Sequence, residues 1–139
     1  MAQSDAAARA TFPVAQGEDP WTAEELAEVR EELLDDIGRM ERAIRTFEAG
    51  LADLFDEGTE GAGRDPADVG ATNFERDQEM SLAANAREMF EQATLALRRF
   101  ESGDYGYCES CGRPIGKDRL QVFPRATMCL PCKQREERR

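Results

Sequence analysis

Aromatic side chains are scarce in this sequence of 139 residues, which contains one Trp, two Tyr and seven Phe. Charged residues make up 34% of the chain and hydrophobic residues 40%. This composition is lean for a globular core and is typical of a long helical hairpin or coiled coil. The length accommodates one domain, or a small domain with a tail.

Long apolar runs and positive charge are also in short supply. No run approaches ~20 apolar residues and no secretory signal opens the chain, so we expect a cytoplasmic protein that does not enter a membrane. The formal net charge of −11 argues against non-specific binding to DNA or anionic membrane, because both depend on Lys and Arg. The charge is uneven, with −15 over residues 1–107 and +4 over residues 108–139.

The N-terminal stretch, residues 1–20, mixes small residues with Pro and Gly without a period, which predicts a disordered tail. A helix start follows it. Thr22 can cap the helix, Glu25 can reach back to the amide of Thr22, and Trp21 can pack on Leu26. Apolar residues then recur at steps of three and four, which indicates a long helix packed against another helix. They are Leu26, Val29, Leu33, Ile37, Met40, Ile44, Phe47, Leu51 and Leu54.

Residues 56–71 contain four Gly and one Pro without periodicity, which predicts a loop. Thr72 and Glu75 form a possible second capping box, and Ser102 with Gly103 a possible helix end. The apolar positions between them again step by three and four. They are Met80, Ala83, Ala86, Phe90, Ala93, Leu97 and Phe100. We therefore expect helices of roughly 33 and 30 residues, forming a monomeric antiparallel coiled-coil hairpin over residues 21–103 with the loop at its tip.

The only four cysteines form two Cys-x-x-Cys pairs separated by seventeen residues, and they are Cys108, Cys111, Cys129 and Cys132. In the cytoplasm such pairs are more typical of metal or redox sites than of disulfides. Two knuckles of this spacing provide the four corners of a thiolate site for one Zn²⁺. The chain has no His and sulfur fills every position, so we expect a structural zinc ion and no enzymatic activity.

Residues 104–139 are thus predicted to form a small four-cysteine zinc-finger domain with a C-terminal helix. They contain few large apolar residues, so the metal is expected to supply much of their folding free energy and its removal to unfold them. Five cations of this segment would soften the negative charge of the thiolates, namely Arg113, Lys117, Arg119, Arg125 and Lys133. The fold class expected for the whole chain is mainly α.

Two other uses of the cysteines carry less weight. A single iron can occupy two such knuckles, as in rubredoxins, but those proteins surround the metal with more aromatic core than Tyr105, Tyr107 and Phe123 provide. A thioredoxin-like redox motif would need one pair in a βαβ context, and the sequence has neither feature.

The stretch GDYGYCESCGRPIGKDRLQVFPRATMCLPCK, residues 103–133, resembles the zinc finger of the DksA/TraR family of bacterial transcription factors. The resemblance covers both cysteine pairs with their spacing, and the acidic hairpin before them is similar too. It implies a regulator without catalysis and without sequence-specific DNA binding, whose coiled coil enters the secondary channel of RNA polymerase. The tip of the hairpin would lie near the active site and alter the lifetime of the promoter open complex.

The family's tip carries an Asp-x-x-Asp-x-Ala motif, and the resemblance places Asp65, Asp68 and Gly70 at its positions. It also makes Arg119 and Lys133 candidate contacts to polymerase or to a nucleotide.

Family members can form a guanosine tetraphosphate site with basic residues of the second helix and the finger. At the matching positions this chain has Asn85, Gln92 and Phe123, and it keeps only Lys133. Because a polyanion needs cationic partners, we expect little response to this nucleotide.

The alternative is a zinc-stabilised coiled-coil adaptor, or a thiol redox sensor that releases zinc on oxidation and does not act on polymerase. Nothing beyond the thiolates favours it.

Overall fold

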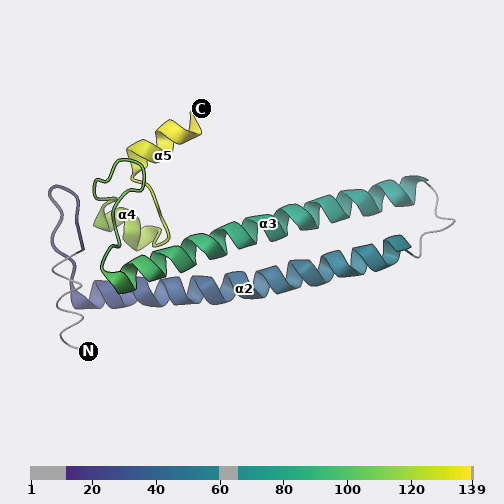
Figure 1. Cartoon of the computed structure of the whole chain (residues 1–139), viewed down its shortest axis with the longest axis horizontal. Coiled ribbons are helices and arrows are strands. Elements are labelled where there is room, and N and C mark those ends of the chain that lie inside the picture. Colours follow the sequence, from purple (N-terminus) through teal and green to yellow (C-terminus); the bar gives the residue numbers. More distant parts are fainter. Residues whose placement is uncertain (1–11, 60–65, 139) are drawn as a thin grey trace. The chain divides into compact units, whose positions relative to one another are not determined.

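The computed structural model describes residues 12–59 and 66–138 (Figure 1). Two long helices, α2 (Ala23–Thr59) and α3 (Pro66–Ser102), are followed by the short helices α4 (Lys117–Val122) and α5 (Leu130–Glu137). No β-strand occurs within the described ranges, where one isolated antiparallel bridge joins Tyr107 and Pro114. The predicted mainly α fold, with two long packed helices before a four-cysteine cluster, is confirmed.

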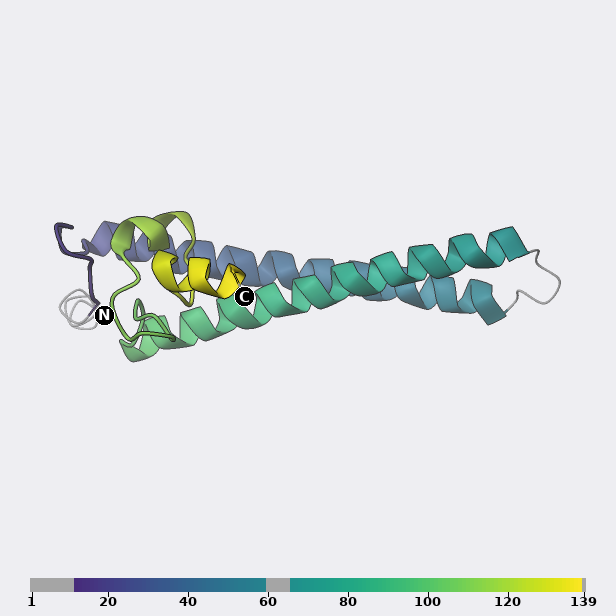
Figure 2. The same cartoon turned by 90° about the horizontal axis from the view of Figure 1, so that it is seen from above.

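The described residues form two compact units. The first, here called the finger unit, comprises the residues up to Ile37 and those from Glu91 onward; the second, the hairpin unit, comprises Gly38–Phe90. Within each unit the segments of α2 and α3 run antiparallel and side by side in both views (Figures 1 and 2). Of the helices in the part of the chain that is described, none carries an apolar stretch long enough to span a bilayer.

The predicted capping box at the start of α2 is present. The Glu25 amide donates to Thr22 Oγ1 (3.1 Å), and the Thr22 amide donates to Glu25 Oε1 (2.9 Å). Trp21 and Leu26 both belong to the buried cluster of the finger unit. The two side chains and the cap together determine where α2 begins, because they satisfy its first amides and cover its first apolar turn.

The α2 seam is buried or half-buried at all nine predicted positions, and burial is complete only at Leu26, Val29 and Leu33. Along α3, the predicted seam is wrong at Met80, which is 51% exposed, whereas Glu79 beside it is partly buried. A Cβ atom on Gly50 would lie 3.3 Å from Glu79 Oε2. Gly50 therefore leaves room for a carboxylate on the seam, and apolar spacing alone could not reveal a polar seam position.

The predicted loop over residues 56–71 is too long, because α2 continues to Thr59 and α3 begins at Pro66. Both helices have 37 residues. Pro66 suits the first turn of α3, because the backbone N–H groups of a first turn have no hydrogen-bond partner within the helix. The negative charge of Asp68 in the same turn interacts favourably with the helix dipole. Thr72 is consequently not a cap; its hydroxyl donates to the Asp68 carbonyl within the helix (3.0 Å).

The prediction of disorder over residues 1–20 is wrong for residues 12–20, which pack on the finger; residues 1–11 lie outside the described part. The buried ring of Phe12 contacts Phe100 (centroids 5.0 Å apart) and Tyr105 (5.7 Å). Trp21 Nε1 donates to the Pro13 carbonyl (3.2 Å). Residues 12–20 contain few apolar residues and show no apolar periodicity. Their partners lie far along the chain, so no local sequence pattern predicts this packing.

The core of the molecule lies in the finger unit and is shared between distant segments. Leu33 of α2 and Leu120 of α4 are both fully buried in one cluster, together with Phe12 and Trp21. The Tyr105 hydroxyl, also buried there, donates to the Pro124 carbonyl (2.7 Å). The finger is thus seated on a core that it shares with α2, α3 and residues 12–21.

Two neighbouring leucines of α2 allow a test of this core. Leu33 is fully buried, whereas Leu34 is 43% exposed. We expect Leu33→Ala to lower the free energy of unfolding by about 2–5 kcal/mol, because it opens a cavity among packed side chains. Leu34→Ala should cost no more than about 1 kcal/mol. Urea denaturation of the zinc-loaded chain measures both values, and equal losses would show that the seam is misplaced.

Candidate metal centre

The first cysteine pair lies in a tight knuckle between Tyr107 and Pro114. The Cys108 amide donates to the Arg113 carbonyl (2.8 Å), and the Gly112 amide donates back to the Cys108 carbonyl (2.9 Å). Gly112 has φ +76°, a conformation that residues with a side chain rarely adopt. These bonds turn the Cys108 and Cys111 side chains toward the same side.

The second pair lies at the start of α5. Cys129 immediately precedes the helix and Cys132 lies in its first turn, so that the Lys133 amide donates to the Cys129 carbonyl (3.0 Å). The two knuckles are joined through the backbone, because the Glu109 amide donates to the Thr127 carbonyl (2.9 Å).

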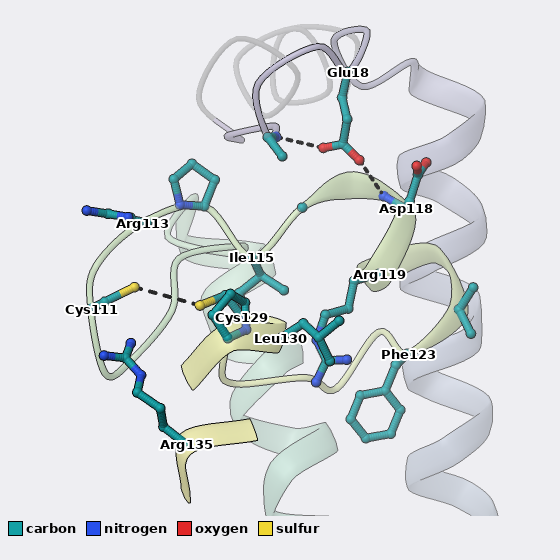
Figure 3. Close-up of a pocket in the computed structure, with 15 residues that line it drawn as sticks. Glu18, Cys111, Arg113, Ile115, Asp118, Arg119, Phe123, Cys129, Leu130 and Arg135 are labelled. Atoms are coloured by element: carbon teal, nitrogen blue, oxygen red, sulfur yellow. Dashed lines mark hydrogen bonds between the residues drawn. The ribbon is translucent and has the colours of Figure 1, made fainter. Parts of the chain in front are cut away.

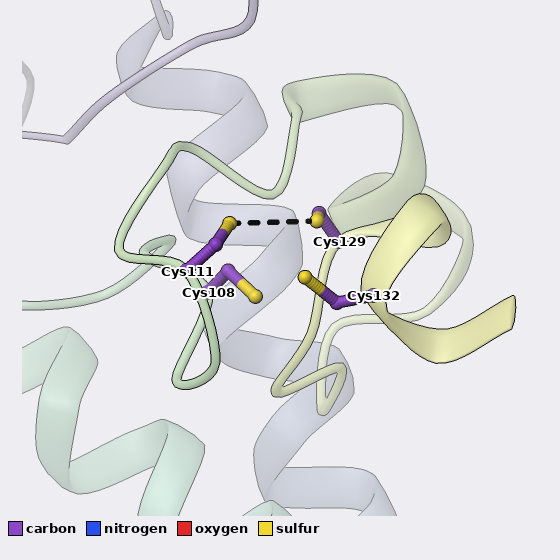
Figure 4. Close-up of side chains that lie close together, drawn as sticks. All are labelled: Cys108, Cys111, Cys129 and Cys132. Carbon is purple, nitrogen blue, oxygen red and sulfur yellow. Dashed lines mark hydrogen bonds between the residues drawn. The ribbon is translucent and has the colours of Figure 1, made fainter. Parts of the chain in front are cut away.

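The structure brings the four sulfur atoms together, all within 4.8 Å of one another (Figure 4). The Sγ atoms of Cys111 and Cys129 are 3.8 Å apart. A tetrahedron with about 2.3 Å from zinc to each sulfur has edges of about 3.8 Å, so this donor set fits one Zn²⁺. Cys108, Cys129 and Cys132 are buried, and Cys111 is exposed.

The charge of the thiolates is balanced by groups that the sequence did not single out. Arg135, one turn after Cys132 on α5, donates from Nη2 to Cys132 Sγ (3.1 Å). Burial disfavours the thiolate of Cys108, but backbone amides of Cys111, Cys129 and Ser110 outweigh it and lower the pKa of Cys108 to about 6. The i, i+3 spacing of Cys132 and Arg135 on a helix was the signal available in the sequence.

Three of the five cations expected near the thiolates have other partners. Lys117 is buried and pairs with Glu25 (2.7 Å), Arg119 Nε donates to the Met128 carbonyl (3.1 Å), and Arg125 donates to Gln92 (3.2 Å). Arg113 and Lys133 are exposed. The prediction that these five cations soften the thiolate charge is therefore wrong for Lys117, because its ammonium pairs with Glu25.

A hollow of about 880 Å³ lies beside the centre, between the first knuckle, α4 and α5 (Figure 3). Arg113, Arg119 and Arg135 line it together with Phe123. Two guanidinium groups lie over the Phe123 ring. The guanidinium carbon of Arg125 is 4.4 Å from the ring centroid, and that of Arg119 is 5.9 Å from it. One candidate contact residue, Arg119, is thus half-buried between a carbonyl and a ring, and Lys133 is exposed on α5.

Of the two tip acids, the structure describes only Asp68, which belongs to the hairpin unit. Asp68 is exposed in the first turn of α3. Asp65 lies outside the described residues. Of the predicted nucleotide positions, Asn85 is exposed on α3, and Gln92 accepts the hydrogen bond from Arg125.

Comparisons with known proteins agree with this arrangement. Residues 103–138 match the family described as prokaryotic dksA/traR C4-type zinc finger. RNA polymerase-binding transcription factor DksA of Caulobacter vibrioides is 41% identical over 75 residues, which cover 54% of this chain and 53% of that protein. Its namesake in Escherichia coli K12 is 38% identical over 69 residues, covering 50% of this chain and 46% of that protein. The chain thus spans about half the length of the curated relatives it matches.

Similarity in three dimensions extends further along the chain. The solved structure of transcription factor DksA2 from Pseudomonas aeruginosa has a TM-score of 0.65 and 27% identity, covering 98% of this chain and 96% of that one. The fold and the cysteine cluster define a helical protein with a C4-type zinc finger. Residues 103–138 are similar to the dksA/traR C4-type zinc finger, and the four cysteines of this finger hold one structural zinc ion.

The four cysteines of the two knuckles would hold the ion together, so the loss of one ligand should lower the zinc content of the chain. Elemental analysis should give one zinc per chain, and Cys132→Ser should fall well below that value because a hydroxyl is a poor zinc ligand. Glu109→Gln, which changes an exposed neighbour of Cys108, should keep the full stoichiometry. Substoichiometric zinc in the wild type, or visible absorbance typical of iron–thiolate, would contradict the assignment.

Proposed function

We propose that the protein is a regulator of transcription that binds RNA polymerase and has no catalytic activity of its own. The observation that carries the proposal is that two relatives, 41% and 38% identical over about half of this chain, are named RNA polymerase-binding transcription factors. The fold similarity to a transcription factor over 98% of the chain supports extending the proposal to the helices. We propose that the chain acts as a monomer in the cytoplasm.

The hairpin unit would enter the secondary channel of polymerase and modulate initiation from there. Its acidic character supports this role, because an acidic surface disfavours the nucleic acid that polymerase also holds. Asp68, exposed in the first turn of α3, and Asp65 just before it would lie near the active site. There they would accept hydrogen bonds or present negative charge.

The basic finger would supply much of the affinity. Residues 108–139 carry a net charge of +4 on an otherwise acidic chain, and Lys133 is exposed. Fluorescence titration of the labelled chain with core RNA polymerase tests this directly. Saturable binding of one chain per polymerase is the expected result, and the absence of binding would favour the adaptor or redox-sensor alternative.

The tip acids should matter for activity and little for folding. The double variant Asp65→Asn/Asp68→Asn should bind core polymerase with nearly wild-type affinity and lose most of its effect on open-complex lifetime. Its stability should change by at most about 1 kcal/mol, the scale of an acid in the first turn of a helix.

Asp53→Asn/Asp77→Asn is the matched control, because it removes the same charge from exposed positions of the same unit. It should keep the wild-type effect. A tip variant that binds polymerase and remains fully active would refute the role of the tip.

Guanosine tetraphosphate should add little to the action of this protein. Asn85, Gln92 and Phe123 provide no cations, and the guanidinium of Arg125 is already bound to Gln92 and stacked on Phe123. In vitro transcription with and without the nucleotide, after subtraction of the protein-independent response, should show no strong synergy. The variant Gln92→Lys/Phe123→Arg should gain a response, and strong synergy in the wild type would overturn the expectation.

A further inference from the structure

The α4 half of the finger is fastened to the N-terminal strap, defined here as residues 12–20. Glu18 Oε1 accepts hydrogen bonds from the amides of Ala15 (2.6 Å) and Lys117 (2.8 Å), and its Oε2 accepts from the amide of Asp118 (2.9 Å; Figure 3). Partial burial opposes ionisation, but these amides hold the pKa of Glu18 below its usual range. One carboxylate thus joins the strap to the start of α4.

Lys117 makes a second attachment. Its buried ammonium pairs with Glu25 Oε1 (2.7 Å), donates to the carbonyls of Asp19 and Pro20 (3.4 Å each), and lies 5.8 Å from the Trp21 ring centroid. The hydrogen bond from Lys117 lowers the pKa of Glu25 to about 2. Because a buried ammonium without partners is strongly disfavoured, this residue holds α4 against the start of α2.

Apolar packing reinforces the same half. Leu120 of α4 is fully buried, and Ile115 and Ala126 on either side of α4 are buried in the same cluster as Phe12 and Leu33. The hydrogen bonds and the ion pair of the α4 half involve no cysteine ligand, whereas the apolar cluster also includes Cys108, Cys129 and Cys132.

The α5 half is held differently. Cys132 is the only buried residue among Leu130–Arg138, and Leu130 is 51% exposed. The hydrogen bonds made by Lys133, Arg135 and Arg138 in this half are local to residues 129–138. Outside the thiolate cluster, the carbonyls of Thr127 and Met128 accept hydrogen bonds from the Glu109 amide and from Arg119 Nε. The other contacts of this half with the core are made by Met128, Cys129 and Cys132, and two of these three are thiolate ligands.

We propose that zinc occupancy governs only the α5 half of the finger. Loss of the ion releases residues 127–138, while α4 and the strap stay packed on the core. The finger then consists of two parts. The α4 half stays packed on the core without metal, whereas the position of α5 depends on the bound metal. This differs from the sequence-based expectation that residues 104–139 unfold together, because that expectation did not include the core shared with residues 12–21.

Hydrogen exchange of the full chain, read by mass spectrometry under reducing conditions with and without a zinc chelator, tests the proposal. We expect amides of α5 to exchange at least about tenfold faster after chelation, and those of Leu120 to Phe123 to change by less than about threefold. Joint loss of protection in α4 and α5 would overturn the proposal, as would an α5 that keeps its protection without zinc.

A strap variant separates the two attachments. Glu18→Gln should still bind one zinc per chain and protect α5, but chelation should now expose α4 as well. Asp19→Asn is the matched control, since its exposed side chain takes no part in the attachment while its carbonyl remains. It should behave as the wild type. Unchanged protection of α4 in chelated Glu18→Gln would show that the strap does not hold α4.

Discussion

Four thiolates within 4.8 Å of one another repel each other strongly, and a divalent cation held by all four would offset that repulsion and tether the two knuckles. The arrangement of the surrounding chain follows from this requirement. The backbone bends at Gly112 to face two sulfurs one way, and α5 starts where it does so that Cys132 meets them. Even with the cation bound the centre carries a net charge of about −2, which explains why amides and Arg135 approach the sulfurs.

The second organising element is the placement of two charges near the start of α2. Glu25 caps the helix through Thr22 and also receives the ammonium of Lys117. The same carboxylate therefore caps the start of α2 and holds the first residue of α4. An aliphatic residue at position 117 could fill the space, but it would leave the carbonyls of Asp19 and Pro20 without a donor.

Local signals and spacing were readable from the sequence, and long-range packing was not. The Thr22–Glu25 cap needs residues three apart, and the cysteine pairs carry their own geometry, so both could be predicted. The strap could not, because Phe12 and Glu18 have partners about ninety to one hundred residues away. In α3, Thr72 has the sequence context of a helix cap, but the helix already begins at Pro66 and Thr72 lies within it. Lys117 was expected to soften the charge of the thiolates, since nothing in the neighbouring sequence shows that its partner is Glu25.

The distance in sequence between Glu18 and α4 has a consequence for synthesis. As the chain leaves the ribosome, α2 can form early, yet Phe12 and Trp21 have no complete cover until residues beyond Leu120 have emerged. Contacts of such high sequence separation form late and slowly. Residues 12–20 are therefore among the last of the described residues to pack, and the apolar surface of Phe12 and Trp21 stays uncovered until Leu120 has been synthesised.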